Sequence, residues 1–598
     1  MALLILLLLL PLSAFSQVEE EPKEGDGGFV TGKQTDRTEA FYDSLKAGSE
    51  RNWVWRTLYP MVFSEDSTEV ELREQDGTFR SWQGKTIRSI QIRVHKAFTP
   101  DSSKGKRSIH NLVAYFGNGI HIKTRDWVIQ ENLFFHEGDR LEPETMLHNL
   151  KYLRKLSYLD EVRFVVKNSS DAADSIDIIV DIKDKFSINL GGGVISRTQM
   201  NLKINDQNFL GLGRLLLTEW HLDTEQRGSL GHKLYYKIPN FRGSFVDTEL
   251  GWAELPGYSW KSMAINRPFL FPVTRAAGGT DISKTWVSAP FDSTEVDDVR
   301  LGGWYGHSFA ARPGSAHQYA YAALSLDQIW YRRRPDVGAD FGKYWHESLM
   351  ATGAIGITES DYGYLPYIYT LLEDNDIPVG FLYEFLFGKE LGEFRNREFL
   401  GLRGAWGKIV HNGAFLHLKG GIETFFSPTG TEQGAITFEP LYITPLQSLG
   451  RFRGRAFFRG RMILGSDRFP PESVALSTDP YFRGNRDISG TTLIALGVEE
   501  DVILPWNVFG FHLSIFGFMD VALVTDKLWV TGNENRLYTE ALGIRFRNPH
   551  LLWDSIELHG EWNQGAGEDK SFNIVLSTKV PIKMLDFEGI RPRPYVFH

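Results

Sequence analysis

The chain has no cysteine among its 598 residues. This excludes disulfide bridges, cysteine-ligated zinc, iron–sulfur clusters, a thiol nucleophile and lipid modification of a cysteine. The chain also has no excess of positive charge, because 65 Lys and Arg residues stand against 75 Asp and Glu, which gives −10. Sequence-independent binding of nucleic acid needs clustered cations that neutralise phosphates, so we expect no nucleic-acid partner.

Long apolar runs are scarce. The run Ala2–Leu12 is too short to span a bilayer, and the small residues that follow it before Gln17 are typical of a signal-peptidase site. Later in the chain, Val502–Met519 lacks Asp, Glu, Lys and Arg, but Pro505 and two glycines interrupt it. We interpret that stretch as strand, turn and strand. An exported chain without membrane-spanning helices is either soluble outside the cytoplasm or a β-barrel.

Glycine and aromatic residues are plentiful, with 58 Gly and 13% Phe, Trp and Tyr. From residue 186 onward, apolar and polar residues alternate with period two, most clearly over Arg451–Leu464. One face of that segment carries five arginines and the other carries apolar residues and glycine; the arginines are Arg451, Arg453, Arg455, Arg459 and Arg461. This pattern is typical of a transmembrane barrel with apolar residues toward lipid and polar residues toward a wet lumen. We predict a mainly β protein whose residues 186–580 form an antiparallel barrel of about sixteen strands, with about fourteen or eighteen fitting nearly as well.

A small α+β domain is predicted before the barrel. Residues 84–185 follow the order strand, helix, helix, strand, strand. The first helix is expected at Arg125–Phe134, a break at Gly138 and the start of the second helix at Pro143. The predicted divisions are a signal peptide (1–16), an extension with short helices (17–83), the small domain (84–185), the barrel (186–580) and a tail (581–598).

This order resembles the BamA/TamA-type outer-membrane assembly barrels, in which a POTRA domain leads into a surface-antigen-type barrel. The more specific likeness is Phe482-Arg483-Gly484, in a long loop between two alternating strands, which resembles the family's Arg-Gly motif. That motif implies a loop that folds into the barrel. Asp520 stands in a segment similar to the family's Phe-x-Asp-x-Gly strand, with Ala522 in the place of the second glycine.

The resemblance implies a loop-lock motif inside the barrel. An arginine in a partly dry lumen needs carboxylate partners, and its planar fork suits bidentate pairing. We expect Asp520 to be one partner and either Glu499 or Glu500 to be the other. A glycine would allow the loop to turn tightly after the arginine. The candidate residues are Phe482, Arg483, Gly484, Glu499, Glu500 and Asp520.

Catalytic motifs are missing. The sequence has no HExxH zinc motif, Walker loop or Gly-x-Ser-x-Gly elbow. We therefore expect no catalytic, metal-binding or cofactor-binding residues, and a protein that is not an enzyme.

The resemblance implies an assembly factor of the bacterial outer membrane, with its POTRA domain in the periplasm. Unfolded barrel proteins would pair with that domain and insert at a seam between strands near Phe186–Ile195 and Phe572–Val580. Expected partners are these clients, periplasmic or lipoprotein accessory subunits, and membrane lipid. The alternative is a dedicated pore for one secreted polypeptide, as in two-partner secretion, with the Phe41–Tyr59 helix as a plug.

A third hypothesis is a structural or lipid-handling barrel that uses the small domain only for docking. The residues after the last predicted strand are unusual, because such barrels typically end at that strand. Either this tail lies outside the barrel or the last strand is misplaced.

Overall fold

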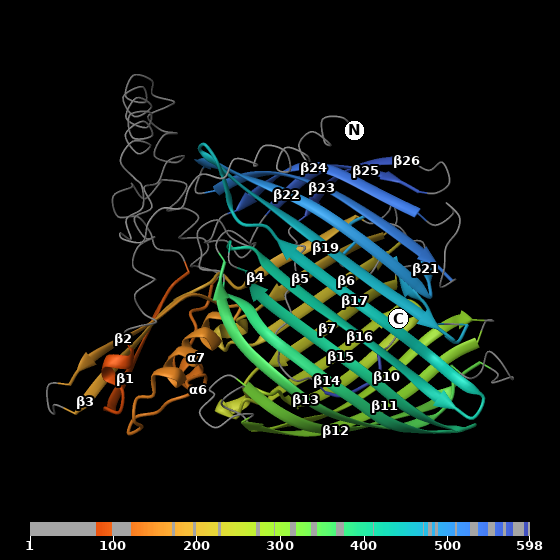
Figure 1. Cartoon of the computed structure of the whole chain (residues 1–598), viewed down its shortest axis with the longest axis horizontal. Helices are drawn as coiled ribbons and strands as arrows, with labels where there is room; N and C mark the ends of the chain where they lie inside the picture. Colours follow the sequence, from red (N-terminus) through yellow and green to blue (C-terminus); the bar gives the residue numbers. More distant parts are fainter. Residues whose placement is uncertain are drawn as a thin grey trace.

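A computed structural model gives the fold (Figure 1). The predicted signal peptide and the Phe41–Tyr59 helix lie outside the residues that it describes. The described residues are 79–97, 121–169, 174–194, 199–224, 229–270, 275–291, 294–310, 318–335, 344–365, 376–410, 412–470, 472–476, 481–484, 488–508, 511–526, 536–547, 556–565, 570–577 and 591–595.

The small domain has the predicted order of elements. After the short helix η2 (Phe79–Trp82) its elements are β1 (Thr86–His95), α6 (Asp126–Glu131), α7 (Pro143–Arg154), β2 (Leu159–Asn168) and β3 (Ser175–Asp184). The strands lie in the order β1-β3-β2, with β1 parallel and β2 antiparallel to the central β3. α6 ends at Glu131, earlier than the expected Phe134, and Pro143 stands in the first turn of α7. Gly138 lies in the connection between the two helices and has a φ of +94°, which a glycine adopts without strain.

The core of this domain lies between the helices and one face of the sheet. Along β3, every second residue is buried, including Ile176, Ile178 and Val180. Leu150 and Leu153 of α7 belong to the same apolar cluster. The apolar residues that recur with period two on the strands therefore pack against those that recur with helical spacing on α7, and together they form one core.

The second unit is a closed antiparallel barrel in which β26 lies beside β4. Its strands are β4 (Ile188–Val194), β5 (Gln199–Asp206), β6 (Leu215–Asp223), β7 (Ser229–Ile238), β8 (Asp247–Leu255), β9 (Tyr258–Arg267), β10 (Ala276–Phe291), β11 (Thr294–Ala310), β12 (Gln318–Arg333), β13 (Ser348–Tyr364), β14 (Asp376–Gly392), β15 (Asn396–Ile409), β16 (Phe415–Ser427), β17 (Gly430–Ile443), β18 (Gln447–Leu449), β19 (Phe452–Ser466), β22 (Thr492–Val508), β23 (Phe511–Thr525), β24 (Arg536–Arg547), β25 (Ile556–Gln564) and β26 (Lys570–Ser577). The short strands β20 (Val474–Ala475) and β21 (Ser489–Gly490) form a separate hairpin.

The expectation of about sixteen strands is not met. Within the described residues, the barrel has twenty strands of seven or more residues, besides the three-residue β18. The estimate assumed about 25 residues for each strand with its connection. The strands β4 to β9 have only 7 to 10 residues each, so more of them fit into the same length.

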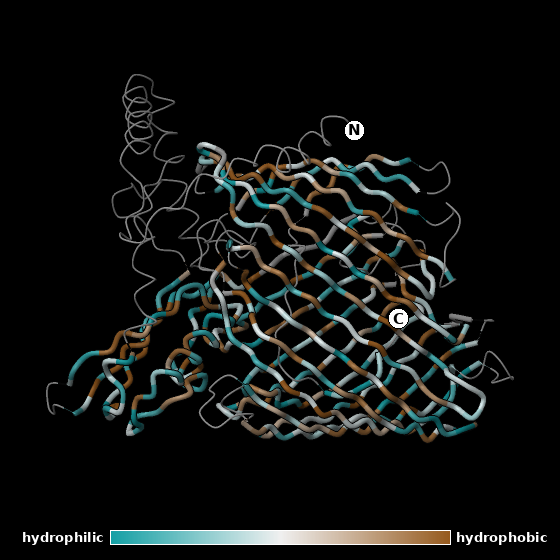
Figure 2. The backbone as a smooth tube through the Cα atoms, viewed as in Figure 1, coloured by the Kyte–Doolittle hydropathy of each residue, from teal (hydrophilic) through white to brown (hydrophobic). Residues whose placement is uncertain are grey.

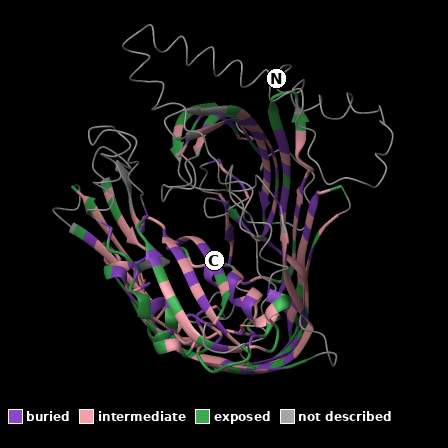
Figure 3. Cartoon of the chain, turned by 90° about the vertical axis from the view of Figure 1, so that its left-hand side faces the viewer, coloured by how far each residue is buried: buried purple, intermediate pink, exposed green. Residues whose placement is uncertain are grey.

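Hydropathy and burial alternate along the barrel strands, as predicted (Figures 2 and 3). On β19, Arg455 and Arg459 point inward and are buried, whereas the side chain of Phe458 points outward and is 43% exposed. On β25, Glu557 and Glu561 are buried and Leu558 and Trp562 are exposed. An outer wall of exposed apolar side chains is typical of a transmembrane barrel. None of the described helices has the length and apolar character needed to cross a membrane.

The small domain docks against one end of the barrel, which we call the domain end. In the β7–β8 connection, the Asn240 amide donates to the Glu131 carbonyl of α6 at 2.7 Å. In α7, Lys151 donates to Asp361 of β13 at 3.2 Å. Because β7 and β13 lie well apart in the ring, the domain extends across part of the opening at this end.

Candidate functional site

The loop between β19 and β22 folds into the barrel. Phe482 is 5% exposed and belongs to an apolar cluster with inward-facing residues of the wall, among them Leu493 of β22 and Ala522 of β23. Tyr481 and Ile488, on either side of the motif, pack against the same cluster. Apolar burial therefore holds this part of the loop against the inner wall.

Arg483 makes the contacts expected of the motif. Its Nε donates to Oδ2 of Asp520 at 2.9 Å and its Nη2 donates to Oδ1 at 3.0 Å, so the pair is bidentate. The backbone N–H of Arg483 donates to Oδ2 of the same carboxylate at 3.1 Å. Its Nη1 donates to Glu499, and its guanidinium carbon lies 3.2 Å from the ring centroid of Phe518. Asp520, Glu499 and the aromatic ring thus surround one cation.

Glu499 and Glu500 lie on opposite faces of β22. Glu499 is 2% exposed and points inward. Glu500 follows it by one residue and shares the outer face with Leu496, which is 57% exposed. A period of two sends adjacent residues to opposite sides of a sheet, so Glu500 does not join the network. Of the two candidates that the sequence left open, the structure brings only Glu499 to Arg483.

Two further arginines extend the network beyond the predicted residues. Arg459 of β19 donates to Asp520 at 2.9 Å. Arg545 of β24 donates to Glu499 at 2.7 Å, to Asp501 at 2.7 Å and to Glu557 at 2.6 Å. Three guanidinium groups therefore face four carboxylates, which offsets the cost of burying each charge. The arginine stripe of β19 could have indicated Arg459, but no sequence motif marks Arg545.

Gly484 is required for a different reason than the one expected from the sequence. Its φ does not lie in the left-handed region. Instead, a Cβ at this position would overlap the Thr539 hydroxyl of β24 and the ring of Phe482. The glycine thus allows a close approach of the loop to the wall, rather than a tight turn.

The arrangement is a brace between a loop and the wall. Its arginines and carboxylates neutralise one another. They form a salt-bridge network and do not resemble a catalytic acid–base pair. Within the residues described, no group of three or more His, Asp or Glu side chains is placed to hold a metal ion. The absence of an enzyme activity and of a cofactor stays a prediction.

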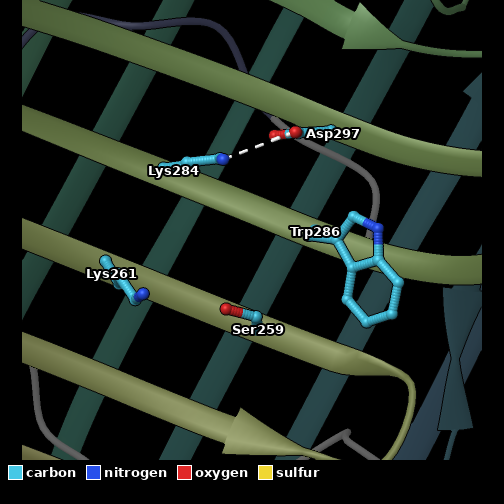
Figure 4. A pocket seen from close by; sticks show the side chains of 5 residues that line it. All are labelled: Ser259, Lys261, Lys284, Trp286 and Asp297. Atoms are coloured by element: carbon cyan, nitrogen blue, oxygen red, sulfur yellow. Dashed lines mark ion pairs between the residues drawn. The ribbon is translucent and has the colours of Figure 1, made fainter.

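A polar pocket lies over β9, β10 and β11 (Figure 4), on the face of these strands that also carries the exposed Met263, Ile282 and Leu301 and close to the turn between β8 and β9. Ser259, Lys261, Lys284, Trp286 and Asp297 line it. Lys284 lies 3.4 Å from Asp297, so opposite charges in the pocket already pair. A tryptophan among charged residues is typical of the aromatic and polar rim of a transmembrane barrel.

The two strands that close the barrel are among its shortest. β4 has seven residues and β26 has eight, whereas β13 and β14 have 17 each. On β26, Ile574 is 74% exposed and Leu576 is 72% exposed. Within the part of the chain that the structure describes, strands this short offer few ladder hydrogen bonds to a neighbouring strand.

Comparison with known proteins gives one curated match. No family model matches the chain. Over 115 residues the chain is 31% identical to the outer membrane protein assembly factor BamA of Buchnera aphidicola subsp. Acyrthosiphon pisum. The chain resembles the BamA-type assembly barrels. The matched stretch covers 19% of this chain and 18% of that BamA, so the chain spans about a fifth of the curated relative.

Solved structures give more distant similarities. CdiB from Escherichia coli is 11% identical with a TM-score of 0.38, over 92% of this chain and 98% of that chain. BamA from Haemophilus ducreyi lacking POTRA domains 1–3 is 9% identical with a TM-score of 0.36, over 82% and 83%. These scores are too low to support a functional argument.

Three other findings confirm the predicted outer-membrane localisation: the closed barrel, its apolar outer wall and the match to BamA.

Proposed function

We propose that this chain is an assembly factor that receives unfolded barrel proteins through its small domain and inserts them into the outer membrane. Insertion would take place at the junction between β26 and β4, where an incoming strand would pair with a separated edge. The observation that carries this proposal is the short length of both closing strands, together with the exposure of β26. The 31% identity to BamA over 115 residues supports it. No bond chemistry and no cofactor are involved.

The free edge of the small domain supports a route for the client. The edge of β1 is covered by the segment before α7, because Ile87 N–H donates to the Asp139 carbonyl at 2.9 Å and Ile90 N–H donates to Glu137 at 3.0 Å. On the other side of the sheet, β2 pairs with β3, and no described strand pairs with its outer edge. An extended client segment would add to β2 by β-augmentation.

The Arg483 brace would keep the loop in a fixed position beside this route. Its carboxylate partners lie on β22 and β23, which are separated from the closing strand β26 only by β24 and β25. The brace would stiffen this part of the wall while the junction opens. Arg483 is therefore a positioning residue, with no direct role toward the client.

The alternative function is a pore for one secreted polypeptide. The twenty strands that the described residues contribute to the barrel favour it, because barrel diameter grows with strand number. The inward-folded loop counts against an open pore, since it occupies part of the lumen.

Depletion of the protein followed by quantitative proteomics of the outer membrane separates the two functions. An assembly factor predicts that many unrelated barrels decrease together, and that re-expression of the full chain restores them. Loss of a single exported protein with unchanged barrels would instead support the secretion pore. Pairing at the β2 edge can be tested with photo-crosslinkers placed along β2 and, as a matched control, on the covered edge of β1.

A further inference from the structure

The described carboxy-terminal residues 591–595 lie inside the barrel. They contact inward-facing side chains from strands that extend around the ring from β10 to β19. The contacting wall residues are Asp281, Ser325, Asp327, Arg403, Glu423 and Arg461. From the sequence we expect either a tail outside the barrel or a misplaced last strand. Residues 591–595 instead lie in the lumen and belong to no strand.

Arg591 fills a notch that three neighbouring strands form. Asp281 of β10, Gly302 of β11 and Asp327 of β12 lie in one row of the sheet. The Arg591 guanidinium donates to both carboxylates. A Cβ on Gly302 would overlap this guanidinium, so the missing side chain provides the space for it. Two carboxylates on either side of a glycine form a site that suits one arginine.

The next residues are held mainly through their backbone. Ser325 donates to the Pro592 carbonyl at 2.5 Å, and Arg403 donates to the Arg593 carbonyl at 2.6 Å. The Tyr595 N–H donates to Glu423, and the Tyr595 hydroxyl accepts from Arg461 at 3.2 Å.

Tyr595 also packs against the apolar cluster that contains Phe482. The segment therefore extends from the Arg591 notch to the loop that carries the Arg483 motif. Wall contacts through carbonyl and N–H groups are the kind that bind an extended chain.

We propose that the lumen contains a binding site for an extended basic peptide, and that this chain's own Arg591–Tyr595 segment occupies it and blocks the lumen at rest. The Arg591 notch supplies the charge selectivity and the backbone contacts supply the extended conformation. This inference does not rest on the proposed assembly function, because a blocked lumen can be measured without any client.

Two neighbouring glycines provide a matched test. Gly302→Ala places a methyl group where Arg591 lies, whereas the Cβ of Gly303→Ala would be 3.7 Å from its nearest neighbour, the Gly279 carbonyl. Single-channel conductance of the full chain in planar bilayers is the measurement, and heat-modifiable electrophoretic mobility checks that each variant is folded.

Gly302→Ala, which would displace the guanidinium, and Arg591→Ala, which removes both of its charge-assisted hydrogen bonds, are each expected to raise the open probability at least about tenfold. Gly303→Ala is expected to behave as wild type. Equal conductance of folded Gly302→Ala, Arg591→Ala and wild type would overturn the proposal.

Crosslinking tests the position of the segment directly, because the natural chain has no cysteine. A Ser325→Cys/Pro592→Cys pair is expected to join with a short thiol crosslinker in intact membranes and to keep the lumen closed. Leu324→Cys/Pro592→Cys is the control, because Leu324 precedes Ser325 but points outward and is 55% exposed. No crosslink from position 325, or equal yields from positions 324 and 325, would contradict the proposed site.

Discussion

Replacing Arg483 with alanine tests the brace between loop and wall. Asp520 would keep Arg459 at 2.9 Å, and Glu499 would keep Arg545 at 2.7 Å, so neither carboxylate would lose every partner. The network would change from three cations facing four anions to two facing four. Removing one partner of a buried ion pair costs about 3–5 kcal/mol. Because the remaining arginines compensate part of the charge, we expect the lower value, about 3 kcal/mol.

A loss of about 3 kcal/mol lowers the equilibrium constant for loop docking roughly 150-fold. Interstrand hydrogen bonds hold the barrel wall independently of Arg483. We therefore expect Arg483→Ala to release the loop before it unfolds the wall. Limited proteolysis of the folded protein is the suitable assay, with cleavage between β19 and β22 identified by mass spectrometry. Heat-modifiable mobility on the same samples reports whether the barrel is closed.

Arg483→Lys shows whether planar, bidentate pairing matters, because lysine retains the charge but lacks the fork. We expect it to restore only part of the protease resistance. If folded Arg483→Ala resists proteolysis as well as wild type, the brace that we infer from the contacts of Arg483 does not hold the loop.

Three further predictions follow from the structure. Glu499→Gln is expected to weaken loop docking by about 1.5–3 kcal/mol and Glu500→Gln to leave it unchanged; equal proteolysis of the two would contradict the assigned faces. Gly484→Ala is expected to displace the loop at a cost of about 1–3 kcal/mol, measured as earlier cleavage, whereas wild-type resistance would refute the close approach. In the small domain, hydrogen bonds from Arg88 and Ser89 lower the pKa of Asp177 below its ordinary value. The ionised form therefore adds stability above that value, and this stability is lost as pH falls below it. Asp177→Asn should lower the melting temperature at neutral pH but not at low pH, and a difference that persists at low pH would exclude this cause.

The sequence by itself determined what depends on neighbouring residues. Adjacent residues of a strand point to opposite faces, so the opposite orientations of Phe458 and Arg459 on β19 were predictable from the sequence before the tertiary structure was known. The order of elements in the small domain was predictable in the same way, because Gly138 indicates a connection between two helices and Pro143 the start of the second. The motif residues Arg483 and Asp520 were recognised through a family resemblance, and the structure places them in contact.

Only the tertiary structure decided what depends on register and on distant contacts. The number of strands depends on where each turn falls, and the short strands β4 to β9 carry no signal of their length. The face that Glu499 shares with Arg483 depends on strand pairing, so a one-residue shift would have selected Glu500 instead. The site around Arg591 joins it to Asp281 and Asp327, which lie 310 and 264 positions away, through a row that exists only once β10, β11 and β12 pair. Local periodicity determines the faces of each strand, but only closure of the barrel brings these charges together.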